Sequence, residues 1–534
     1  MDQTLVTYSA AERIWSGPPR NSIYKDDTAF GVVIFQSMKN WPKNICQIWD
    51  DEGVAVTFEE ALTWAIRIAQ FFKRRELNHK NIIGIAAGHS KYLLSLAVAC
   101  LMNGTPFHAP HSVLDEATLR YVFSITKPNL IFCDGKDFEK VKAATIEWQP
   151  EIYTLTDHVE GVPNIESLLE PTTTEMSYQP EPLVDGCDQT VALLCSSGTT
   201  GLPKVVCIEN RRLLHFLIPP INSESIVFQA TAIDWLGGIA LLIFNTTLGC
   251  TRILSRNPFT SEYIVHLVRK YKIDILALAP LPFTALVNCP DATAEALSSI
   301  RQVFYVGGSI ALTTIQKGQK LMGNASIGTV YASTEATSIT AIYKIEKGNP
   351  MGKPVAGVKI RIVGENGENL TYNQVGEILV HNGLTWQGYY GNPEATRESQ
   401  DSEGWHHTGD MGYFNEDNLL YMVDRCKDIL KYEAMHYWPG EIEAVILELP
   451  QVQNVCVVGI RDELENDAAG ALVVLKKGST ISAKEIVEHV VKKLPPVHKQ
   501  LHAGVQFTNE LPTNPNGKVV RKRAIGMFNA LKAA

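Results

Sequence analysis

Several features that would assign this chain to a particular class of protein are missing from its sequence. The 534 residues include ten cysteines, but these are scattered from Cys46 to Cys456 and form no C-x-x-C pair. This spacing argues against a zinc site or a disulfide framework, and it is typical of a reducing compartment. The net charge is −9 and no long basic run occurs, so the sequence does not indicate nucleic-acid binding.

The sequence also lacks recognisable targeting and membrane segments. The uncharged stretch from Trp235 to Thr251 contains glycines, an asparagine and threonines, and it is too short and too polar to span a bilayer. The N-terminal MDQTLVTYSAAER has no basic start and no apolar core like those of a signal peptide, and the C-terminal LKAA is not a peroxisomal S-K-L signal. We therefore expect a cytoplasmic protein without a transmembrane segment.

Helical and strand patterns alternate through about the first three quarters of the chain. Thr57 and Glu60 form a capping-box pattern that predicts a helix start, and the helical segment 91–102 stops at Asn103-Gly104. Continuous apolar segments of strand length follow one another at 81–87, 129–133, 190–195, 273–279 and 303–308. Strands of this kind between helices favour mostly parallel sheets covered on both faces, so we expect a large layered α/β domain.

The pattern changes after about Asp424. A charged stretch, DRCKDILKYE, leads into EIEAVILEL, NVCVVGI, ALVVLKK, AKEIVEHVVKKL and VQFTNEL. These segments predict a small α+β domain of roughly one hundred residues, within the usual size range of a domain. A chain of 534 residues is longer than one hydrophobic core usually serves, which agrees with at least two domains.

The stretch 193–206, LLCSSGTTGLPKVV, is a glycine-rich loop that follows an apolar strand. It does not have the G-x-x-x-x-G-K-[ST] spacing of a P-loop. Backbone amides and hydroxyls in such a loop can nevertheless form a nest for an anion, and a lysine adds charge. The candidate anion-binding residues are Ser196, Ser197, Gly198, Thr199, Thr200, Gly201 and Lys204.

Four further segments change the interpretation of this loop. They are VGGS (306–309), YASTEAT (331–337), GWHHTGDMGYF (404–414) with VDRCKDILKY (423–432), and PTNPNGKVVRK (512–522). In this order and at these intervals the chain resembles the adenylate-forming superfamily, which comprises acyl-CoA synthetases, peptide-synthetase adenylation domains and beetle-type luciferases. The resemblance extends from about Tyr24 to Arg523, and it is strongest to luciferase-like insect acyl-CoA synthetases.

This resemblance implies a two-step reaction with ATP, Mg²⁺ and coenzyme A. A small-molecule carboxylic acid and ATP give an acyl-adenylate and pyrophosphate, and a thiol (or oxygen in luciferases) then consumes the adenylate. The implied domains are residues 1–426, with the ATP and acyl pockets, and a mobile lid of residues 427–534 with its hinge at Lys427. Because a carboxylate is a poor nucleophile and the triphosphate repels it, cationic groups have to stabilise the transition state.

The resemblance also assigns roles to single residues. Lys518 matches the lysine that bridges the substrate carboxylate and the α-phosphate, and Lys431 matches the residue that assists thioester formation. Glu335 matches the magnesium ligand, a hard oxygen donor suited to this cation. The remaining implied nucleotide contacts are Thr334, which faces the α-phosphate, Tyr331 on adenine, Asp410 and Arg425 at the ribose, and Gly307, Gly308, Ala332, Ser333 and Tyr421 around the nucleotide.

Two regions suggest how this chain differs from its relatives. Val205, Ala332 and Ala434 stand where the family usually has glycine, and the segment around Ala434 lines the coenzyme A tunnel in the family. The acyl pocket is expected to be floored by DWLGGIALL (234–242), including Trp235 and Gly238, and its composition predicts a hydrophobic acid. We therefore expect an acid–CoA ligase. A luciferase of the light-emitting fly type that uses O₂ is the alternative, and a catalytically inactive scaffold is a third hypothesis.

Overall fold

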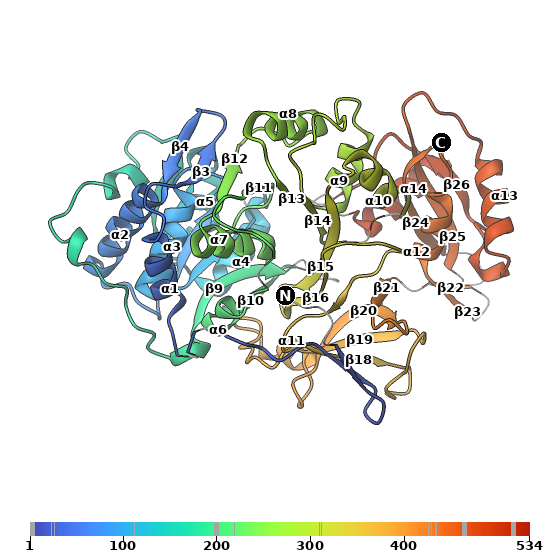
Figure 1. Cartoon of the computed structure of the whole chain (residues 1–534), viewed down its shortest axis with the longest axis horizontal. Helices are drawn as coiled ribbons and strands as arrows, with labels where there is room; N and C mark the ends of the chain where they lie inside the picture. Colours follow the sequence, from blue (N-terminus) through green and yellow to red (C-terminus); the bar gives the residue numbers. More distant parts are fainter. Residues whose placement is uncertain are drawn as a thin grey trace.

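The structure is a computed structural model that describes residues 6–22, 24–25, 27–111, 113–196, 202–217, 219–308, 310, 312–425, 428, 430–432, 435–461, 467–513 and 519–533. A large N-terminal α/β part contains three sheets, and a smaller unit follows at the C-terminal end (Figure 1). The predicted fold class is therefore confirmed.

The first sheet consists of six strands in the order β10-β9-β6-β5-β7-β8, and all neighbours except β10 and β9 run parallel. The expected strands at 81–87, 129–133 and 190–195 lie in it. Helices α1, α2 and α3 cover one face, and α4 and α5 cover the other. The elements are β5 (Ile83–Ala86), β6 (Phe107–Ala109), β7 (Leu130–Asp134), β8 (Glu151–Thr156), β9 (Thr190–Ser196), β10 (Lys204–Glu209), α1 (Phe30–Met38), α2 (Phe58–Arg74), α3 (Leu93–Asn103), α4 (Glu116–Thr126) and α5 (Phe138–Ala144).

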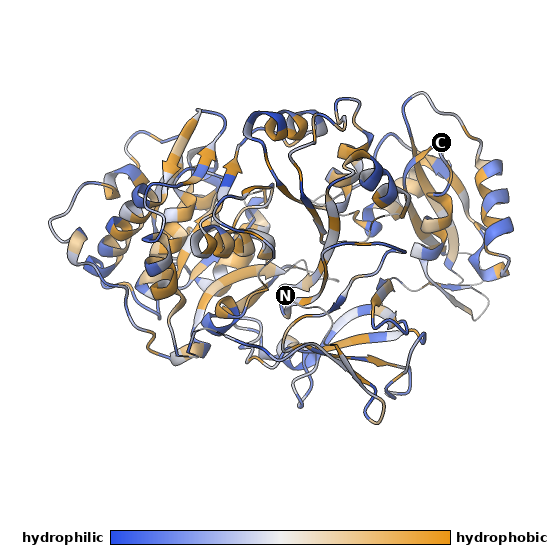
Figure 2. Ribbon diagram, in the orientation of Figure 1, coloured by the Kyte–Doolittle hydropathy of each residue, from blue (hydrophilic) through white to orange (hydrophobic). Residues whose placement is uncertain are grey.

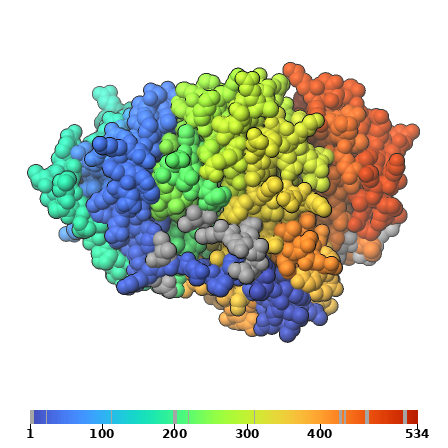
Figure 3. All heavy atoms as spheres, in the orientation of Figure 1, coloured from blue at the N-terminus to red at the C-terminus, as the bar shows by residue number. Residues whose placement is uncertain are grey.

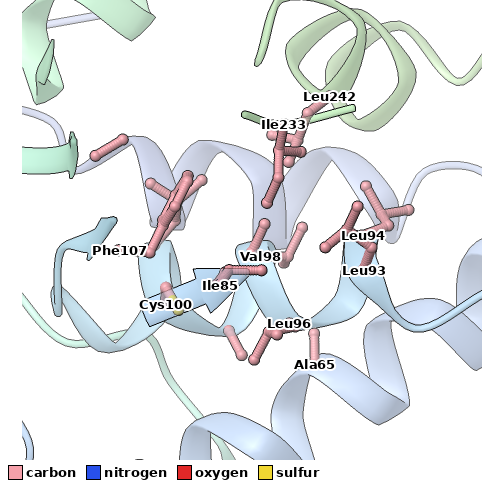
Figure 4. Close-up of a cluster of buried hydrophobic side chains, with 14 of the residues drawn as sticks. Ala65, Ile85, Leu93, Leu94, Leu96, Val98, Cys100, Phe107, Ile233 and Leu242 are labelled. Atoms are coloured by element: carbon pink, nitrogen blue, oxygen red, sulfur yellow. The ribbon is translucent and has the colours of Figure 1, made fainter. Parts of the chain in front are cut away.

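Local signals define the two central helices of this layer. Thr57 Oγ1 accepts from the Glu60 N–H at 3.2 Å, and the Glu60 carboxylate accepts from the Thr57 N–H at 2.8 Å, which confirms the capping box of α2. Helix α3 ends at Gly104, whose φ of 65° is left-handed. Helix α3 is buried on every side, and its side chains are therefore mostly apolar all round the helix. Figure 4 shows Leu96 of α3 against Ala65 of α2, while other side chains of α3 point away from α2.

The second sheet consists of nine strands in the order β17-β16-β15-β14-β13-β11-β12-β3-β4. The strands from β15 to β3 are parallel, and the outer pairs are antiparallel. Helices α8, α9 and α10 pack on one face, and α7 contributes to the other. The elements are β3 (Ile45–Trp49), β4 (Val54–Thr57), β11 (Ile226–Gln229), β12 (Thr251–Leu254), β13 (Ile275–Leu278), β14 (Gln302–Val306), β15 (Ser326–Ser333), β16 (Thr337–Ile342), β17 (Lys353–Pro354), α7 (Leu236–Leu248), α8 (Ser261–Tyr271), α9 (Pro280–Asn288) and α10 (Leu312–Leu321).

The third sheet is antiparallel throughout, and it departs from the expected alternation of helices and strands. Short connections join its first two strands and its last two strands, and connections of this length permit antiparallel but not parallel neighbours. The N-terminal strands complete the sheet, and Trp15 stacks on Phe414 with ring centroids 4.3 Å apart. Figure 3 shows this N-terminal segment, in blue, against the orange strands. In order the strands are β1 (Thr7–Ser9), β2 (Ile14–Ser16), β18 (Lys359–Val363), β19 (Gly376–His381), β20 (His406–Phe414) and β21 (Leu420–Arg425).

The C-terminal unit is the predicted small α+β structure. Its described residues form a three-stranded sheet, a two-stranded hairpin and three α-helices, and the outward side of α13 is hydrophilic (Figure 2). The predicted hinge, Lys427, lies outside the described residues, so the domain boundary stays a prediction. The elements are β22 (Leu430–Tyr432), β23 (Met435–Tyr437), β24 (Val452–Arg461), β25 (Asp467–Leu475), β26 (Gly504–Phe507), α12 (Pro439–Ile446), α13 (Ala483–Lys493) and α14 (Arg521–Ala533).

Two expectations about composition can be compared with the structure. The cysteines in the described part of the chain are free thiols, as their spacing predicted, and most of them are buried. Among the described residues, no helix combines the length and the apolar character needed to cross a membrane. The remaining short helices are α6 (Asn210–Leu214), α11 (Pro393–Ser399), η1 (Gly135–Asp137), η2 (Ile165–Leu168), η3 (Glu175–Ser177), η4 (Gly186–Asp188) and η6 (Val497–Lys499).

Candidate functional site

The candidate residues gather at the carboxyl ends of parallel strands. In the nine-stranded sheet, Trp235 follows β11, Gly307 follows β14 and Glu335 follows β15. In the six-stranded sheet, Ser196 ends β9 and pairs with Lys204 at the start of β10. Parallel strands expose their carboxyl ends on one edge, which is where ligands bind in α/β sheets.

Three predicted nucleotide-binding residues contact one another. The Tyr331 hydroxyl, on β15, donates to Asp410 Oδ2 at 2.7 Å, and Arg425 Nε lies 3.2 Å from Asp410 Oδ1. Burial, followed by the charge of Asp410, raises the pKa of Tyr331 well above its ordinary value. The phenol therefore remains a hydrogen-bond donor, and the group offers an aromatic ring beside a carboxylate that can accept hydrogen bonds from two hydroxyls.

The register of β20 and β21 determines which side chain reaches Asp410. Asp410 pairs with Arg425 and Tyr413 pairs with Tyr421, and a register shift lies between the two pairs. The rings of Tyr413 and Tyr421 stack with centroids 5.3 Å apart. Tyr421, which the family resemblance assigns to the nucleotide, thus lies beside Tyr413 rather than beside Asp410.

The loop lysine and the predicted metal ligand meet at a tyrosine. Tyr389 donates its hydroxyl to Glu335 Oε1 at 2.9 Å, and Lys204 Nζ lies 4.7 Å from the centroid of the Tyr389 ring. A cation at this distance is attracted by the face of the ring. Tyr389 is buried, and its ring meets Trp386 edge-on at 5.2 Å.

Main-chain hydrogen bonds place Tyr389 along the free edge of β10. The Cys207 N–H donates to the Gly388 carbonyl at 3.0 Å, and the Tyr390 N–H donates to the Val205 carbonyl at 2.7 Å. Tyr389 forms an antiparallel bridge with Val206. Lys204 is two residues from Val206 and on the same face of the strand, so Tyr389 is its diagonal cross-strand neighbour.

The main chain of Glu335 is held by a buried arginine. Its carbonyl accepts from Arg212 Nη1, and Arg212 Nε lies 2.7 Å from Glu209 Oε2. The side chains of Arg212 and Glu209 are 2% and 0% exposed. Burial lowers the pKa of Arg212 and raises that of Glu209, and each shift is opposed by the charge of the partner. Because separating the two partners would leave a buried charge uncompensated, the ion pair stays formed. It therefore fixes the position of Arg212, which holds the Glu335 carbonyl.

The surroundings of Glu335 fit a magnesium ion bound together with a nucleotide. Among the described residues, no group of three or more His, Cys, Asp or Glu side chains could hold a metal. Mg²⁺ needs no such cage, because it commonly keeps waters and binds through one or two carboxylates plus substrate phosphates. Ser333 Oγ accepts from the Ala336 N–H at 3.0 Å and thereby orders the turn that carries Thr334 and Glu335.

The start of α7 combines apolar and polar groups. The rings of Trp235 and His111 meet edge to face at 5.6 Å, and Asp234 Oδ2 lies 3.5 Å from His111 Nε2. Burial raises the pKa of Asp234 to about 7 and lowers that of His111 to about 4. The predicted pocket floor therefore includes a buried carboxyl group. At Gly238 an added Cβ would lie 1.7 Å from the Ala232 carbonyl oxygen, so only glycine fits.

The other predicted site residues are placed as follows. Gly307 has a φ of 98°, which favours glycine, and Gly308 follows it. Val205, one of the departures from glycine, is buried in the core of the six-stranded sheet, and Ala332 lies at a register shift of β15. Lys431 lies on β22 with its side chain exposed. Ser197, Gly198, Thr199, Thr200, Gly201, Lys427, Ala434 and Lys518 lie outside the described residues.

Sequence reasoning missed the two residues that hold Glu335. Tyr389 belongs to the segment GYYGNP (388–393), where a glycine followed by aromatics precedes a helix start. The φ of Gly388 is 88°, and a Cβ there would lie 2.3 Å from Thr396 Cγ2. Arg212 follows Glu209 by three residues in the polar segment ENRR (209–212). These signals are weak in sequence, because the contacts are made with distant segments.

Comparison with known proteins gives an independent result. A model of the AMP-binding enzyme family matches residues 34–390, and a model of the AMP-binding enzyme C-terminal domain matches residues 441–518. The chain is 27% identical over 519 residues to 4-coumarate–CoA ligase 3 of Oryza sativa subsp. japonica, covering 92% of this chain and 91% of that protein. It is 28% identical over 535 residues to the luciferin 4-monooxygenase of Photinus pyralis, covering 95% and 96%.

The fold is also found among solved structures. The anthranilate CoA ligase AuaEII in complex with anthranoyl-AMP superposes with a TM-score of 0.86 at 18% identity, over 96% of this chain and 99% of that one. At this identity the likeness concerns the fold alone. The two family models and the curated relatives agree with the clustered residues described above. The chain therefore belongs to the AMP-binding enzyme family, within the adenylate-forming superfamily that also contains the beetle luciferases.

Proposed function

We propose that this protein is an ATP-dependent acid–CoA ligase. In the first step, a carboxylate oxygen of the acid attacks the α-phosphorus of ATP, the bond to the β-phosphate oxygen breaks, and pyrophosphate leaves. In the second step, the thiolate sulfur of coenzyme A attacks the acyl carbon, and AMP leaves with the electron pair of the broken C–O bond. The thiol proton is released.

The arrangement around Asp410 and Glu335 is the observation that carries this proposal. One group, Tyr331 with Asp410 and Arg425, suits adenosine, and a second group, Lys204 with Tyr389 and Glu335, suits a triphosphate and its metal. Tyr331 and Glu335 are four residues apart along β15 and the following turn, so both groups can address one nucleotide. Bound Mg²⁺ would neutralise the negative charge of the phosphates. Lys518 would neutralise negative charge where the substrate carboxylate reacts.

The substrate we propose is a hydrophobic carboxylic acid. Trp235 and the apolar side chains of α7 lie at the edge where the acid would bind, and the relatives described above are named for carboxylates, 4-coumarate and anthranilate. Asp234 does not oppose this assignment, because burial raises its pKa and so favours its neutral form up to about pH 7. A medium or long acyl chain and an aromatic acid both fit this description.

A luciferase is the second candidate. The similarity to the luciferin 4-monooxygenase of Photinus pyralis extends over 95% of this chain, as far as the similarity to the ligases. Both activities begin with adenylation and differ in whether a thiol or O₂ consumes the adenylate. Lys431, which the resemblance assigns to thioester formation, favours the ligase.

A pyrophosphate-release screen over fatty and aromatic acids, with and without coenzyme A, tests the proposal. We expect ATP- and Mg²⁺-dependent pyrophosphate release with a subset of acids, followed by an acyl-CoA product identified by mass spectrometry. Glu335→Gln serves as the matched variant, and it should lose activity while keeping its fold. Light emission with a luciferin and negligible thioester for every acid would favour the luciferase instead. Absence of pyrophosphate release with all acids would overturn both candidates.

A further inference from the structure

Tyr389 touches both side chains that the proposed function places at the triphosphate. Its hydroxyl is bonded to Glu335, and its ring faces the Lys204 ammonium. Only 8% of Tyr389 is exposed, and Trp386 packs against the ring. A side chain enclosed in this way keeps one rotamer, so a single rigid group sets the positions of the lysine and the carboxylate relative to each other.

We propose that Tyr389 is a positioning residue for magnesium-dependent ATP binding. Its hydroxyl orients the Glu335 carboxylate for the metal, and its ring separately holds the Lys204 ammonium. This inference rests on the proposed function, which supplies the nucleotide and the cation.

The hydroxyl and the carboxylate form a charge-assisted pair. A carboxylate that accepts a hydrogen bond on Oε1 has a defined orientation and can present Oε2 to a cation. The partners that orient ligating carboxylates matter energetically, because their removal typically lowers metal affinity or activity by ~10–100-fold. Burial, followed by the charge of Glu335, raises the pKa of Tyr389, so the hydroxyl remains a donor at all working pH values.

The ring has a separable role. The Lys204 ammonium contacts the face of the Tyr389 ring, and such a contact is worth ~0.5–2 kcal/mol depending on desolvation. Without it, a lysine side chain with four rotatable bonds would have to be ordered by the nucleotide itself. Removing the hydroxyl alone should therefore affect the metal-dependent part of ATP binding, and removing the ring should affect the metal-independent part as well.

The backbone makes these two roles testable. Tyr389 is placed by the pairing of residues 388–390 with β10 and by its own N–H, which donates to Thr396 Oγ1 at 2.9 Å. None of these bonds uses the hydroxyl, so Tyr389→Phe keeps the main chain and the ring in position. Tyr390 is the matched control, because it is adjacent in sequence, the residue is 38% exposed, and Tyr390→Phe removes the same atom.

The experiment is calorimetric titration of the full-length protein with ATP, once with excess Mg²⁺ and once with EDTA. For Tyr389→Phe we expect ~10–100-fold weaker binding of MgATP and unchanged binding of ATP in EDTA. For Tyr389→Leu we expect both to weaken, and for Tyr390→Phe neither. Melting temperature measured in parallel shows whether each variant is folded.

A double-mutant cycle with Glu335→Gln guards against an indirect effect. If Tyr389 acts through the Glu335 carboxylate, Tyr389→Phe changes nothing further in the Glu335→Gln background. Equal weakening in Mg²⁺ and EDTA, unchanged binding in both, or full additivity in the cycle would each overturn the inference. A wild-type protein that binds ATP no better with Mg²⁺ would overturn it too. A wild type that shows the magnesium effect but releases no pyrophosphate with any acid would contradict the proposed function alone.

Discussion

At the residue scale, Asp410 illustrates how a single buried group depends on its partners. It is 7% exposed, and its two carboxylate oxygens are met by Tyr331 and Arg425 from different strands. A buried carboxylate with fewer partners would be costly, since the desolvation of an unpaired acceptor opposes folding. The same oxygens are the ones we assign to a ribose, so stability and ligand binding are linked at this residue.

Tyr331→Phe tests that link. The substitution leaves Asp410 Oδ2 without its donor, so we expect the free energy of unfolding to fall by ~1–3 kcal/mol. Urea denaturation at neutral pH measures this, with Tyr390→Phe as the exposed control. Saturating ATP should restore part of the loss, because a ribose hydroxyl can replace the phenol as donor. Unchanged stability would show that the Tyr331 hydroxyl does not support Asp410.

Lys518 lies outside the described residues, and its role is a proposal from the family resemblance. Lys518→Ala should slow acyl-adenylate formation by ~10²–10³-fold, the effect of removing one preorganised group that stabilises transition-state charge. Thioester formation from synthetic acyl-adenylate should be much less affected. Rapid-quench measurements of the two half-reactions would separate them, and equal losses in both would contradict a lysine that serves only adenylation.

At the scale of elements, the start of α7 brings Asp234 from one sheet against His111 from the other. Burial raises the pKa of Asp234 from 3.8 to about 7, so the native state favours the protonated form. The unfolded chain ionises near pH 4. Below about pH 4 the carboxyl group is protonated in both states, and its burial then destabilises the native state least. As the pH rises from about 4 to about 7, its burial opposes folding increasingly.

Asp234→Asn should remove that pH dependence. We expect the variant to gain stability relative to wild type as the pH rises through this window, by on the order of 2–4 kcal/mol at its upper end. His111, whose pKa burial lowers, is retained in both proteins. Chemical denaturation at several pH values measures the difference, with Asp185→Asn at an exposed carboxylate as control. A difference that is constant with pH would refute this account.

At the scale of the whole molecule, a hydrogen bond across the predicted hinge opposes movement of the C-terminal unit. Asp424 Oδ2, on β21, accepts from the Gly440 N–H at the start of α12 at 3.0 Å. Arg521, on α14, lies 3.2 Å from Glu443 and 3.9 Å from Asp428, and both of these ion pairs lie within the C-terminal unit. A rotation between two half-reactions about a residue between β21 and β22 would have to break the bond between Asp424 and Gly440.

Lys427→Pro tests the proposed rotation. Proline fixes φ near −65° and removes the N–H, so it should resist a large change of backbone angles at this residue. Pyrophosphate release should survive, while acyl-CoA production should fall at least tenfold, an order-of-magnitude expectation for loss of a required conformational step. Steady-state assays of both products check this. Wild-type rates for both would show that Lys427 is not the pivot.

Much of the parallel framework could be predicted because its signals are local. The capping box at Thr57, the stop at Gly104 and the continuous apolar strands depend on neighbouring residues and on burial on both faces of a sheet. The antiparallel sheet was not predicted, because two of its strands come from the N-terminus and pair with segments more than three hundred residues away. Such pairing leaves no local pattern.

The candidate site divides in the same way. The acid at position 410, the hard oxygen donor at 335 and the lysine after the glycine-rich loop could be named because the motifs resemble those of the adenylate-forming superfamily. Their mutual contacts could not. Tyr389, Arg212 and the register shift that brings Arg425 to Asp410 depend on strand pairing and on the docking of distant segments, because hydrogen bonds and ion pairs act over a few ångströms in space, whatever the separation along the chain.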